Sequence, residues 1–268
     1  LAARNTVIVQ NHAACINEQF SKITDDGYLR MIEMKVPSNA TAPASGQRDY
    51  GTAAFYGCGT GSPWKSNSQL ISEGCRMEIR ARLRGQKNGF NMGIWLVSDE
   101  SAGQKSYSEI DILENPVGPV TGDRAHQTFH TGPTTTDNKT KTANNTINMT
   151  EWNIYWVEWR SDTEVAIGIN GEETVTLKKT VCYKKADCPA GYWTFTDEQN
   201  LNGLKFILTM GAPNKWGLGG GTEVNGVWSP DAGWDSGFAS YNNYERDKEN
   251  DAIPRLEIDW VRTYINKA

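Results

Sequence analysis

The sequence predicts an all-β protein organised as one domain over residues 1–268. Residues 76–84 and 256–264 alternate between apolar and polar side chains, which is the period of a half-buried strand. No segment repeats apolar residues at positions i, i+3, i+4 and i+7 over the length of a helix. Single β-sandwich domains often exceed roughly 200 residues, and the sequence has no internal repeat. We therefore expect no second domain.

The first half of the chain contains four expected strands. The dipeptide Asp26-Gly27 favours a tight turn and precedes an apolar run. Residues 37–49 are rich in Pro, Ser, Ala, Thr and Gly, which predicts a loop. Apolar alternation and β-branched residues mark the strands, which we expect at residues 28–36, 76–84, 90–97 and 108–115.

The second half contains five more expected strands. Residues 131–150 are rich in Thr, Asn and Lys, and we expect a long polar loop there that can overhang a cleft. The dipeptide Asn170-Gly171 predicts a two-residue hairpin turn. The strands are expected at residues 126–130, 152–159, 165–171, 204–210 and 256–264.

Residues 108–115 carry three carboxylates among aliphatic residues. Side chains alternate along a strand, so Glu109 and Asp111 share one face. Glu114 falls on the opposite face unless one extra residue is inserted. A β-bulge at Ile112-Leu113 would return Glu114 to the face of the other two acids. The alternative is an exposed strand whose acids only meet solvent.

A row of three acids on one face has a chemical use. In the bulged strand, Glu109 and Glu114 are separated by on the order of 13 Å between Cα atoms, so their carboxyl groups can lean to roughly 5–6 Å. That separation is typical of retaining glycosidases, in which one carboxylate attacks the sugar and the other acts as acid and then base. We assign Glu109 as the nucleophile, Glu114 as the acid/base and Asp111 as the residue that orients Glu109. Crowding of like charges raises at least one pKa, which suits Glu114 to donate a proton.

The sequence Glu-Ile-Asp-Ile-Leu-Glu at 109–114 resembles the bulged Glu-x-Asp-x-x-Glu signature of glycoside hydrolase family 16, in its laminarinase-type branch. The closing strand at 256–264 is similar to that family's last strand, and the resemblance covers about residues 23–266. It implies a jelly roll of two curved antiparallel sheets, like that of concanavalin A, with the acids on the concave face. Laminarinases usually carry Trp-Pro-Ala-x-Trp-Met before the catalytic strand. Here only Trp95 of that motif is matched, as in galactan-cleaving relatives.

The resemblance also suggests residues that bind substrate. The family often places a histidine where His130 stands. Sugar rings present apolar C–H faces that stack on aromatic side chains. Arg80, on the alternating strand, is the arginine that we expect near the acids. The aromatic residues expected in the cleft are drawn from Trp64, Trp95, Trp193, Trp216, Trp228 and Trp234.

The expected function is retaining endo-hydrolysis of β-1,3-glucan or mixed β-1,3/1,4-glucan. One alternative is an algal galactan such as agarose, porphyran or carrageenan, whose sulfated forms would favour basic loop residues such as Lys139 and Lys141. The other is a lectin-like domain that binds carbohydrate without catalysis. A pure binder has no need for three crowded carboxylates, so we favour the enzyme.

Charge and composition restrict the partners. The net charge of −5 argues against nucleic acid, and no apolar run reaches the length of a membrane span. We expect a secreted or extracellular monomer, in the periplasm or at the cell surface if bacterial, in a mature or trimmed form. Family resemblance suggests no required cofactor but a structural calcium at Asp259, with an ion pair to a neighbouring cation as the alternative.

The five cysteines are Cys15, Cys58, Cys75, Cys182 and Cys188. Cys182 can pair with Cys188 across a short loop, and Cys58 with Cys75; the alternative is that all five are free and buried. An odd count leaves at least one thiol unpaired in a monomer.

Overall fold

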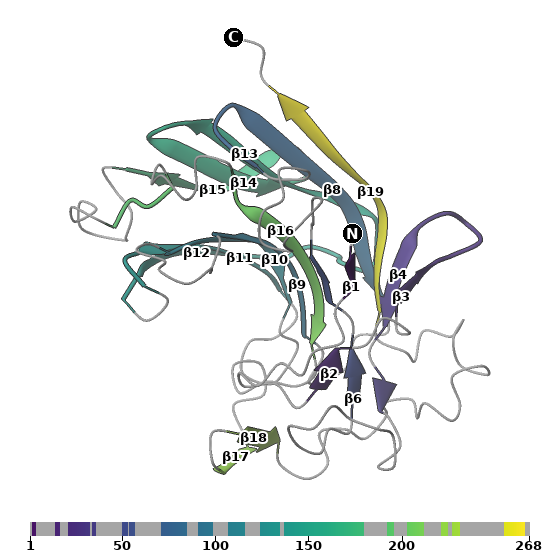
Figure 1. The fold of residues 1–268 in the computed structure, drawn as a ribbon. Helices are drawn as coiled ribbons and strands as arrows, with labels where there is room; N and C mark the ends of the chain where they lie inside the picture. The colour runs from purple at the N-terminus through teal and green to yellow at the C-terminus, as the bar shows by residue number, and fades with distance from the viewer. Residues whose placement is uncertain are drawn as a thin grey trace.

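The computed structural model describes residues 2–3, 14–16, 21–32, 34–35, 50–52, 54–56, 71–84, 91–98, 107–115, 124–134, 137–179, 192–195, 203–211, 221–224, 227–230 and 255–265. These residues form strands and turns, with no helix among them, so none of them forms a helix that could cross a membrane. The two large sheets form two layers that face each other (Figure 1). The all-β prediction is therefore confirmed.

Sheet 1 contains the acid-bearing strand β10. Its seven strands are all antiparallel. They lie in the order β1 (Ala2–Ala3), β7 (Ala54–Tyr56), β16 (Lys205–Gly211), β9 (Asn91–Val97), β10 (Tyr107–Glu114), β11 (Ala125–Gly132) and β12 (Lys139–Asn145).

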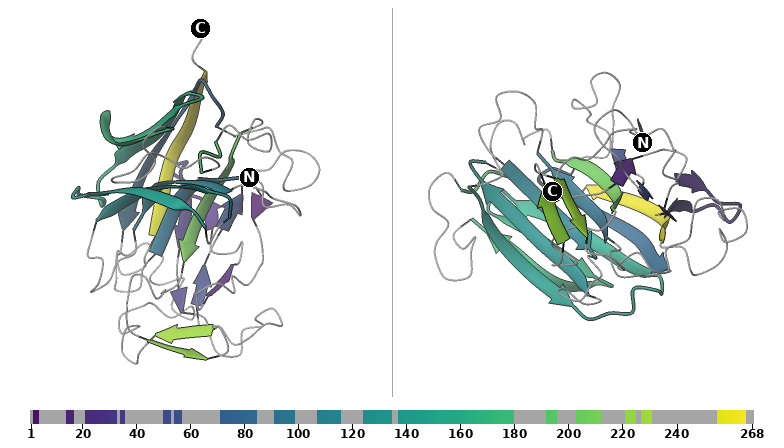
Figure 2. Two further views of the ribbon diagram at one scale, coloured as in Figure 1. Left: turned by 90° about the vertical axis from the view of Figure 1, so that its left-hand side faces the viewer. Right: turned by 90° about the horizontal axis from the view of Figure 1, so that it is seen from below.

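Sheet 2 is also antiparallel and covers one face of sheet 1, as the turned views in Figure 2 show. Its strands lie in the order β15 (Glu172–Lys178), β14 (Glu164–Ile169), β13 (Asn153–Ser161), β8 (Cys75–Arg84), β19 (Arg255–Ile265), β4 (Leu29–Ile32) and β3 (Ser21–Ile23). Two small sheets complete the described part: β17 (Gly221–Val224) with β18 (Val227–Pro230), and β2 (Ala14–Ile16), β6 (Tyr50–Thr52) and β5 (Met34–Lys35).

The core lies between the two large sheets and follows the alternation in the sequence. On β8 every second residue is buried, and the residues between them are partly exposed. The buried side chains pack against those of the facing sheet in one continuous cluster. Its members include Met77, Ile79, Ala81 and Leu83 of β8, Ile110, Ile112 and Leu113 of β10, and Tyr155, Val157 and Trp159 of β13.

The predicted Asn-Gly hairpin joins β14 to β15. Asn170 has φ of 52° and Gly171 has φ of 89°, which is the left-handed region that a two-residue turn of this kind requires. The Asn170 Oδ1 atom accepts a hydrogen bond of 2.8 Å from the backbone N–H of Ile154. The two-residue hairpin turn predicted from the Asn170-Gly171 dipeptide is confirmed.

Two predictions are corrected by the fold. The polar residues 131–150 are not one loop, because β12 forms within them at the edge of sheet 1; a polar edge strand lacks the apolar alternation that would predict it. Cys75 begins β8 as a buried free thiol, so the expected Cys58–Cys75 disulfide is not formed. The thiol lies 3.6 Å from Ser72 Oγ. Cys58, Cys182 and Cys188 lie outside the described residues.

Candidate active site

Strand β10 holds the acids near the middle of sheet 1. Its core-facing residues Ile110, Ile112 and Leu113 are fully buried between the sheets. The acids therefore lie on the face of sheet 1 that is turned away from sheet 2. On the neighbouring strand β11, Glu109 is paired with His130, Asp111 with Thr128 and Glu114 with His126.

The register of β10 confirms the predicted bulge. Asp111 and Glu114 pair with residues only two apart on β11, so Ile112 and Leu113 lie opposite Gln127 alone. The pairing with β9 also shifts between Asp111 and Leu113. Because both Ile112 and Leu113 pack into the core, Glu114 returns to the face of Glu109 and Asp111.

Glu109 is held from two sides. The Tyr107 hydroxyl, two residues earlier on the same face, donates a hydrogen bond to Glu109 Oε2. The Nε2 atom of His130 lies 3.7 Å from Glu109 Oε1 and 3.3 Å from Asp111 Oδ2. The other ring nitrogen of His130 lies 3.3 Å from Asn138 Oδ1, which fixes the ring orientation. These contacts orient the carboxylate of Glu109 and leave its side chain 17% exposed.

Asp111 is the most buried of the three acids, with 3% exposure. Burial raises the pKa of Asp111 first, followed by the negative charge of Glu109 and a hydrogen bond to Glu109. A protonated Asp111 donates that hydrogen bond and stabilises the ionised form of Glu109. Among the described residues, Asp111 Oδ2 has no aligned hydrogen-bond partner.

Glu114 has the electrostatics of a proton donor. Burial raises its pKa well above the ordinary value of 4.5, and the charges of Asp111 and Glu109 raise it further. His130 opposes this shift, because a nearby positive charge favours the ionised carboxylate. A raised pKa favours the protonated form of Glu114, which is the form that a general acid needs.

Trp95 lies beside the acids, and its role as an aromatic platform stays a prediction. It pairs with Asp111 across β9 and β10 and is only partly buried. With Val97, Tyr107 and Ile207 it forms an apolar patch on the acid-bearing face of sheet 1. The other three residues are buried, so only the partly exposed ring of Trp95 offers an apolar face on which a sugar ring can stack.

The prediction for Arg80 is wrong. Arg80 is on β8 in sheet 2, on the side of that strand opposite to the core residues Ile79 and Ala81. The sandwich core therefore separates it from the acids. Its guanidinium forms an ion pair with Asp259 and lies 4.6 Å from the ring centroid of Trp152. The error arises because local alternation does not reveal which sheet a strand joins.

The predicted aromatic set divides into three groups. Trp193 is 7% exposed and belongs to the core, where its ring lies 5.2 Å from that of Phe195, so its assignment to the cleft is wrong. Trp228 is on β18, but its side chain is not described. Trp64, Trp216 and Trp234 lie outside the described residues.

Two groups bear on metal binding. The Asp259 carboxylate is engaged by Arg80, which is the ion pair that the sequence left as the alternative to calcium. Glu109, Asp111 and His130 offer ligand atoms that all lie within 4.8 Å of one another. A cation held there would neutralise the charge of Glu109, so this group fits a proton network better than a resident metal.

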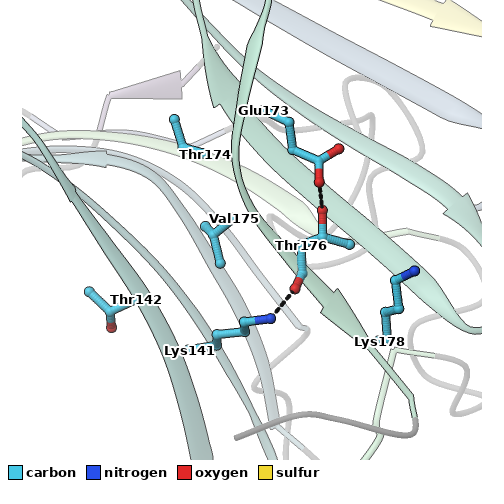
Figure 3. Close-up of a pocket in the computed structure, with 7 residues that line it drawn as sticks. All are labelled: Lys141, Thr142, Glu173, Thr174, Val175, Thr176 and Lys178. Atoms are coloured by element: carbon cyan, nitrogen blue, oxygen red, sulfur yellow. Dashed lines mark hydrogen bonds between the residues drawn. The ribbon is translucent and has the colours of Figure 1, made fainter. Parts of the chain in front are cut away.

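A separate groove of about 420 Å³ opens between the edge strands β12 and β15 (Figure 3). Lys141 crosses it and donates a hydrogen bond of 2.6 Å to the backbone carbonyl of Thr176. On the far side, the Thr176 hydroxyl donates to Glu173. Lys141 therefore joins the two sheets at their open edge. The side chain of Lys139 is not described.

Three residues of the site were not anticipated from the sequence: Tyr107, Asn138 and Gln127. Tyr107 follows from the alternation, because it is two residues before Glu109 on the same face. Asn138 and Gln127 carry no local signal, since their contacts with His130 and Ile112 depend on which segments lie side by side.

Comparison with known proteins extends the structural result. No protein-family profile matches the sequence, and no curated protein matches it. Solved structures match over nearly the whole chain. A glycoside hydrolase family 16 protein of the mixed-linkage glucan locus of Bacteroides ovatus, in complex with a product, has a TM-score of 0.65 at 12% identity, covering 98% of this chain and 94% of that one.

Two further structures are similar. The catalytic domain of an endo-1,3-β-glucanase (laminarinase) from Thermotoga petrophila has a TM-score of 0.62 at 17% identity, covering 97% of this chain and 85% of that one. A structure reported among endo-acting O-glycanases of the human gut microbiota has a TM-score of 0.65 at 17% identity, covering 99% and 84%. At these identities the likeness establishes the fold, which is the jelly-roll sandwich of family 16 enzymes. The predicted fold class is confirmed.

Proposed function

We propose that this chain is a retaining endo-glycoside hydrolase of family 16 that cleaves β-1,3-glucan or mixed β-1,3/1,4-glucan. The observation that carries the proposal is the bulged strand β10, which gathers Glu109, Asp111 and Glu114 on one face of sheet 1. The named glucanases that share the fold support the choice of substrate class.

The first step forms a covalent intermediate. The ionised Glu109 carboxylate attacks the anomeric carbon while Glu114 gives its proton to the departing glycosidic oxygen. The C–O bond to the leaving sugar breaks, and an ester bond to Glu109 forms. Tyr107 and protonated Asp111 hold Glu109 by hydrogen bonds, so its lone pair is aimed before the substrate arrives.

The second step restores the enzyme. Glu114, now ionised, takes a proton from a water molecule that attacks the anomeric carbon, and the ester bond to Glu109 breaks. Two inversions give net retention of the β configuration. His130 balances the site: it lies within 3.7 Å of both Glu109 and Asp111, and it limits how far the Glu114 pKa rises.

A β-linked galactan is the second candidate substrate. The absent Trp-Pro pair before Trp95 favours it, since galactan-cleaving relatives lack that pair as well. We also propose secretion and a monomeric state. A structural calcium at Asp259 would have to displace Arg80 from that carboxylate, so an ion pair is the simpler role.

A polymer screen combined with product analysis tests the proposal. Laminarin, mixed-linkage glucan, agarose, porphyran and carrageenan are each incubated with the protein, and new reducing ends are measured. The proton NMR spectrum of the first products then reports the anomer. We expect release of oligosaccharides from a β-1,3-containing glucan with the β anomer appearing first. Activity on galactans alone would show that the substrate is a galactan and not a β-glucan. An α anomer appearing first would refute the retaining mechanism.

A further inference from the structure

Gln127 is a fully buried amide that lies opposite the bulge. It is on β11 between His126 and Thr128, but it faces the core while they face the acids. Its Nε2 atom donates a hydrogen bond of 2.7 Å to the backbone carbonyl of Ile112, the residue that the bulge inserts. A polar side chain in an apolar core that donates to the carbonyl of an irregular strand residue requires an explanation.

The bulge itself creates the need for this hydrogen bond. Ile112 and Leu113 face a single residue of β11, so regular ladder pairing is interrupted at this point. A buried backbone carbonyl without a partner is strongly disfavoured. The amide of Gln127 supplies a donor from the strand that the ladder would otherwise have used.

Contacts at both ends orient the amide. Its Oε1 atom accepts a hydrogen bond of 3.0 Å from Asn145 Nδ2 and one of 2.5 Å from Thr174 Oγ1, whose hydroxyl also lies 3.1 Å from the Ile167 carbonyl. The Nε2 end then faces the Ile112 carbonyl, with the Gly168 carbonyl at 3.5 Å. Thr174 is on β15, so the chain of contacts runs from the edge of sheet 2, through the core, to the bulge in sheet 1.

We infer that Gln127 is a positioning residue for Glu114: it fixes the bulge that turns the acid/base toward Glu109 and Asp111. The inference rests on the proposed glycosidase function. Gln127 touches neither substrate nor reacting atoms. It acts through the backbone of residues 112–114, and a rigid bulge places the proton of Glu114 at a fixed distance from the glycosidic oxygen.

Two variants and one matched control test the inference. Gln127→Met keeps the length of the side chain and removes both the donor and the acceptor. Thr174→Val keeps Gln127 and removes one of the two donors that orient its amide. Asn153→Ala is the control: Asn153 is 6% exposed, donates to the carbonyls of Asn148 and Glu151 and accepts from Asn170, and none of these partners belongs to the bulge.

On the polymer that the wild type hydrolyses best, we expect Gln127→Met to lower kcat about 10- to 100-fold, because a misplacement of about 1 Å has effects of that size. KM should change less than kcat, since the sugar-binding surface is intact. Thr174→Val should give a smaller loss of the same kind. Asn153→Ala should lower the melting temperature and leave kcat within about twofold of wild type.

An activated aryl glycoside separates a misplaced Glu114 from a general loss of structure. Its leaving group needs no proton, and azide needs no base to attack the glycosyl intermediate. We therefore expect azide to raise the turnover of Gln127→Met on this substrate and to leave the wild type unchanged. A kcat for Gln127→Met within twofold of wild type, or no response to azide, would overturn the inference. If Gln127→Met does not fold, the same criteria apply to Thr174→Val.

A measurement without substrate separates this inference from the proposed function. The carboxyl carbon of Glu114 is followed by NMR across pH in the wild type and in Gln127→Met. We expect the titration midpoint to fall toward the ordinary value in the variant, because Glu114 leaves its crowded position. If the wild type is inactive on every polymer but the titration midpoint of Glu114 still falls in Gln127→Met, the proposed function is refuted and the positioning role of Gln127 is not. An active wild type with an unshifted variant would refute the positioning alone.

Discussion

The molecule carries two charged faces, one on each sheet. The charges are paired with opposite charges on one face and crowded with like charges on the other. On the outer face of sheet 2, acids alternate with arginines. Each of four acids there lies against a guanidinium: Glu158, Glu164, Glu173 and Glu257. On the acid-bearing face of sheet 1, three carboxylates crowd together around one histidine. Both patterns look alike in the sequence as strands with alternating charge.

Glu257 illustrates the paired face. It is fully buried on β19, yet Arg30, Arg82 and Arg255 place Nε atoms at 2.6–3.3 Å from its carboxylate oxygens. Arg160 similarly bridges Glu158, Glu164 and Glu173 at 2.8–3.0 Å. Such networks have a structural explanation, because the charges stabilise one another within the sheet.

The acid row of sheet 1 has no such explanation. Within the described part of the chain, neither Asp111 nor Glu114 forms an ion pair with an arginine or a lysine, and burial raises the pKa of both. Crowded, buried acids of this kind oppose folding and are typical of functional sites. The comparison indicates that lack of neutralisation, and not acidity, distinguishes the strand that we propose as catalytic from the strands with a structural ion-pair network.

The largest expected effect is on catalysis. Glu109→Gln and Glu114→Gln should each lower turnover by about 10²–10⁴-fold or more, since each removes a group that acts in the transition state. Initial rates on the best polymer measure this loss. Azide should rescue Glu109→Gly with an inverted product and Glu114→Gly with a retained one. If either glutamine variant kept most of the wild-type activity, the catalytic role proposed for that glutamate would be wrong.

A substitution on the outer face of sheet 2 should lower the free energy of unfolding and leave catalysis unchanged. Glu257→Gln leaves three arginines around a neutral amide, and breaking a buried ion pair in this way costs about 3–5 kcal/mol. Urea unfolding measures the change, while the activity per folded molecule should match the wild type. A variant as stable as the wild type would show that the network around Glu257 contributes nothing, and the contrast between the faces would fail.

Tyr107→Phe sharpens the comparison within sheet 1. The variant keeps the ring in the apolar patch with Trp95 and removes the hydroxyl that donates to Glu109. We expect a loss in kcat of about tenfold, the size of one hydrogen bond to a charged group. The acidic limb of the pH–rate profile should move to higher pH, because the ionised nucleophile loses a donor. An unchanged profile would assign Tyr107 to packing alone.

The pH dependence of stability gives a smaller effect with a definite sign. The pKa values of Asp111 and Glu114 are raised from 3.8 and 4.5, so between those values and the raised ones the folded protein keeps protons that the unfolded chain has released. The free energy of unfolding should therefore fall as pH rises through this window. Asp111→Asn should flatten the fall and be more stable than the wild type at neutral pH, because the variant has no buried carboxyl to ionise there. Unfolding by urea from pH 4 to 8 tests it, and a wild type that gains stability over this range would contradict the sign.

Much of the site could be predicted from the sequence because it depends on local rules. Alternation places Glu109 and Asp111 on one face, and the two aliphatic residues before Glu114 predict the bulge. The Asn170-Gly171 turn follows from the same kind of local chemistry. These features need no knowledge of which strands are neighbours.

The errors and omissions depend on contacts between distant strands. Arg80 precedes the acid-bearing strand in sequence but joins the other sheet, and Trp193 packs into the core from a segment without regular alternation. The hydrogen bond from Gln127 to Ile112 requires the register of β11 on β10. Alternation fixes the two faces of a strand, and it contains no information on its partners.

Trapping the covalent intermediate tests the central claim most directly. A 2-deoxy-2-fluoro glycoside that matches the best polymer and carries a good leaving group slows the second step, so the sugar remains on the nucleophile. Peptide mass spectrometry of the inactivated protein should find the added sugar on Glu109, and Glu109→Gln should take no label. A label on any other residue, or equal labelling of the variant, would contradict the assignment of the acid row on β10 as the catalytic centre.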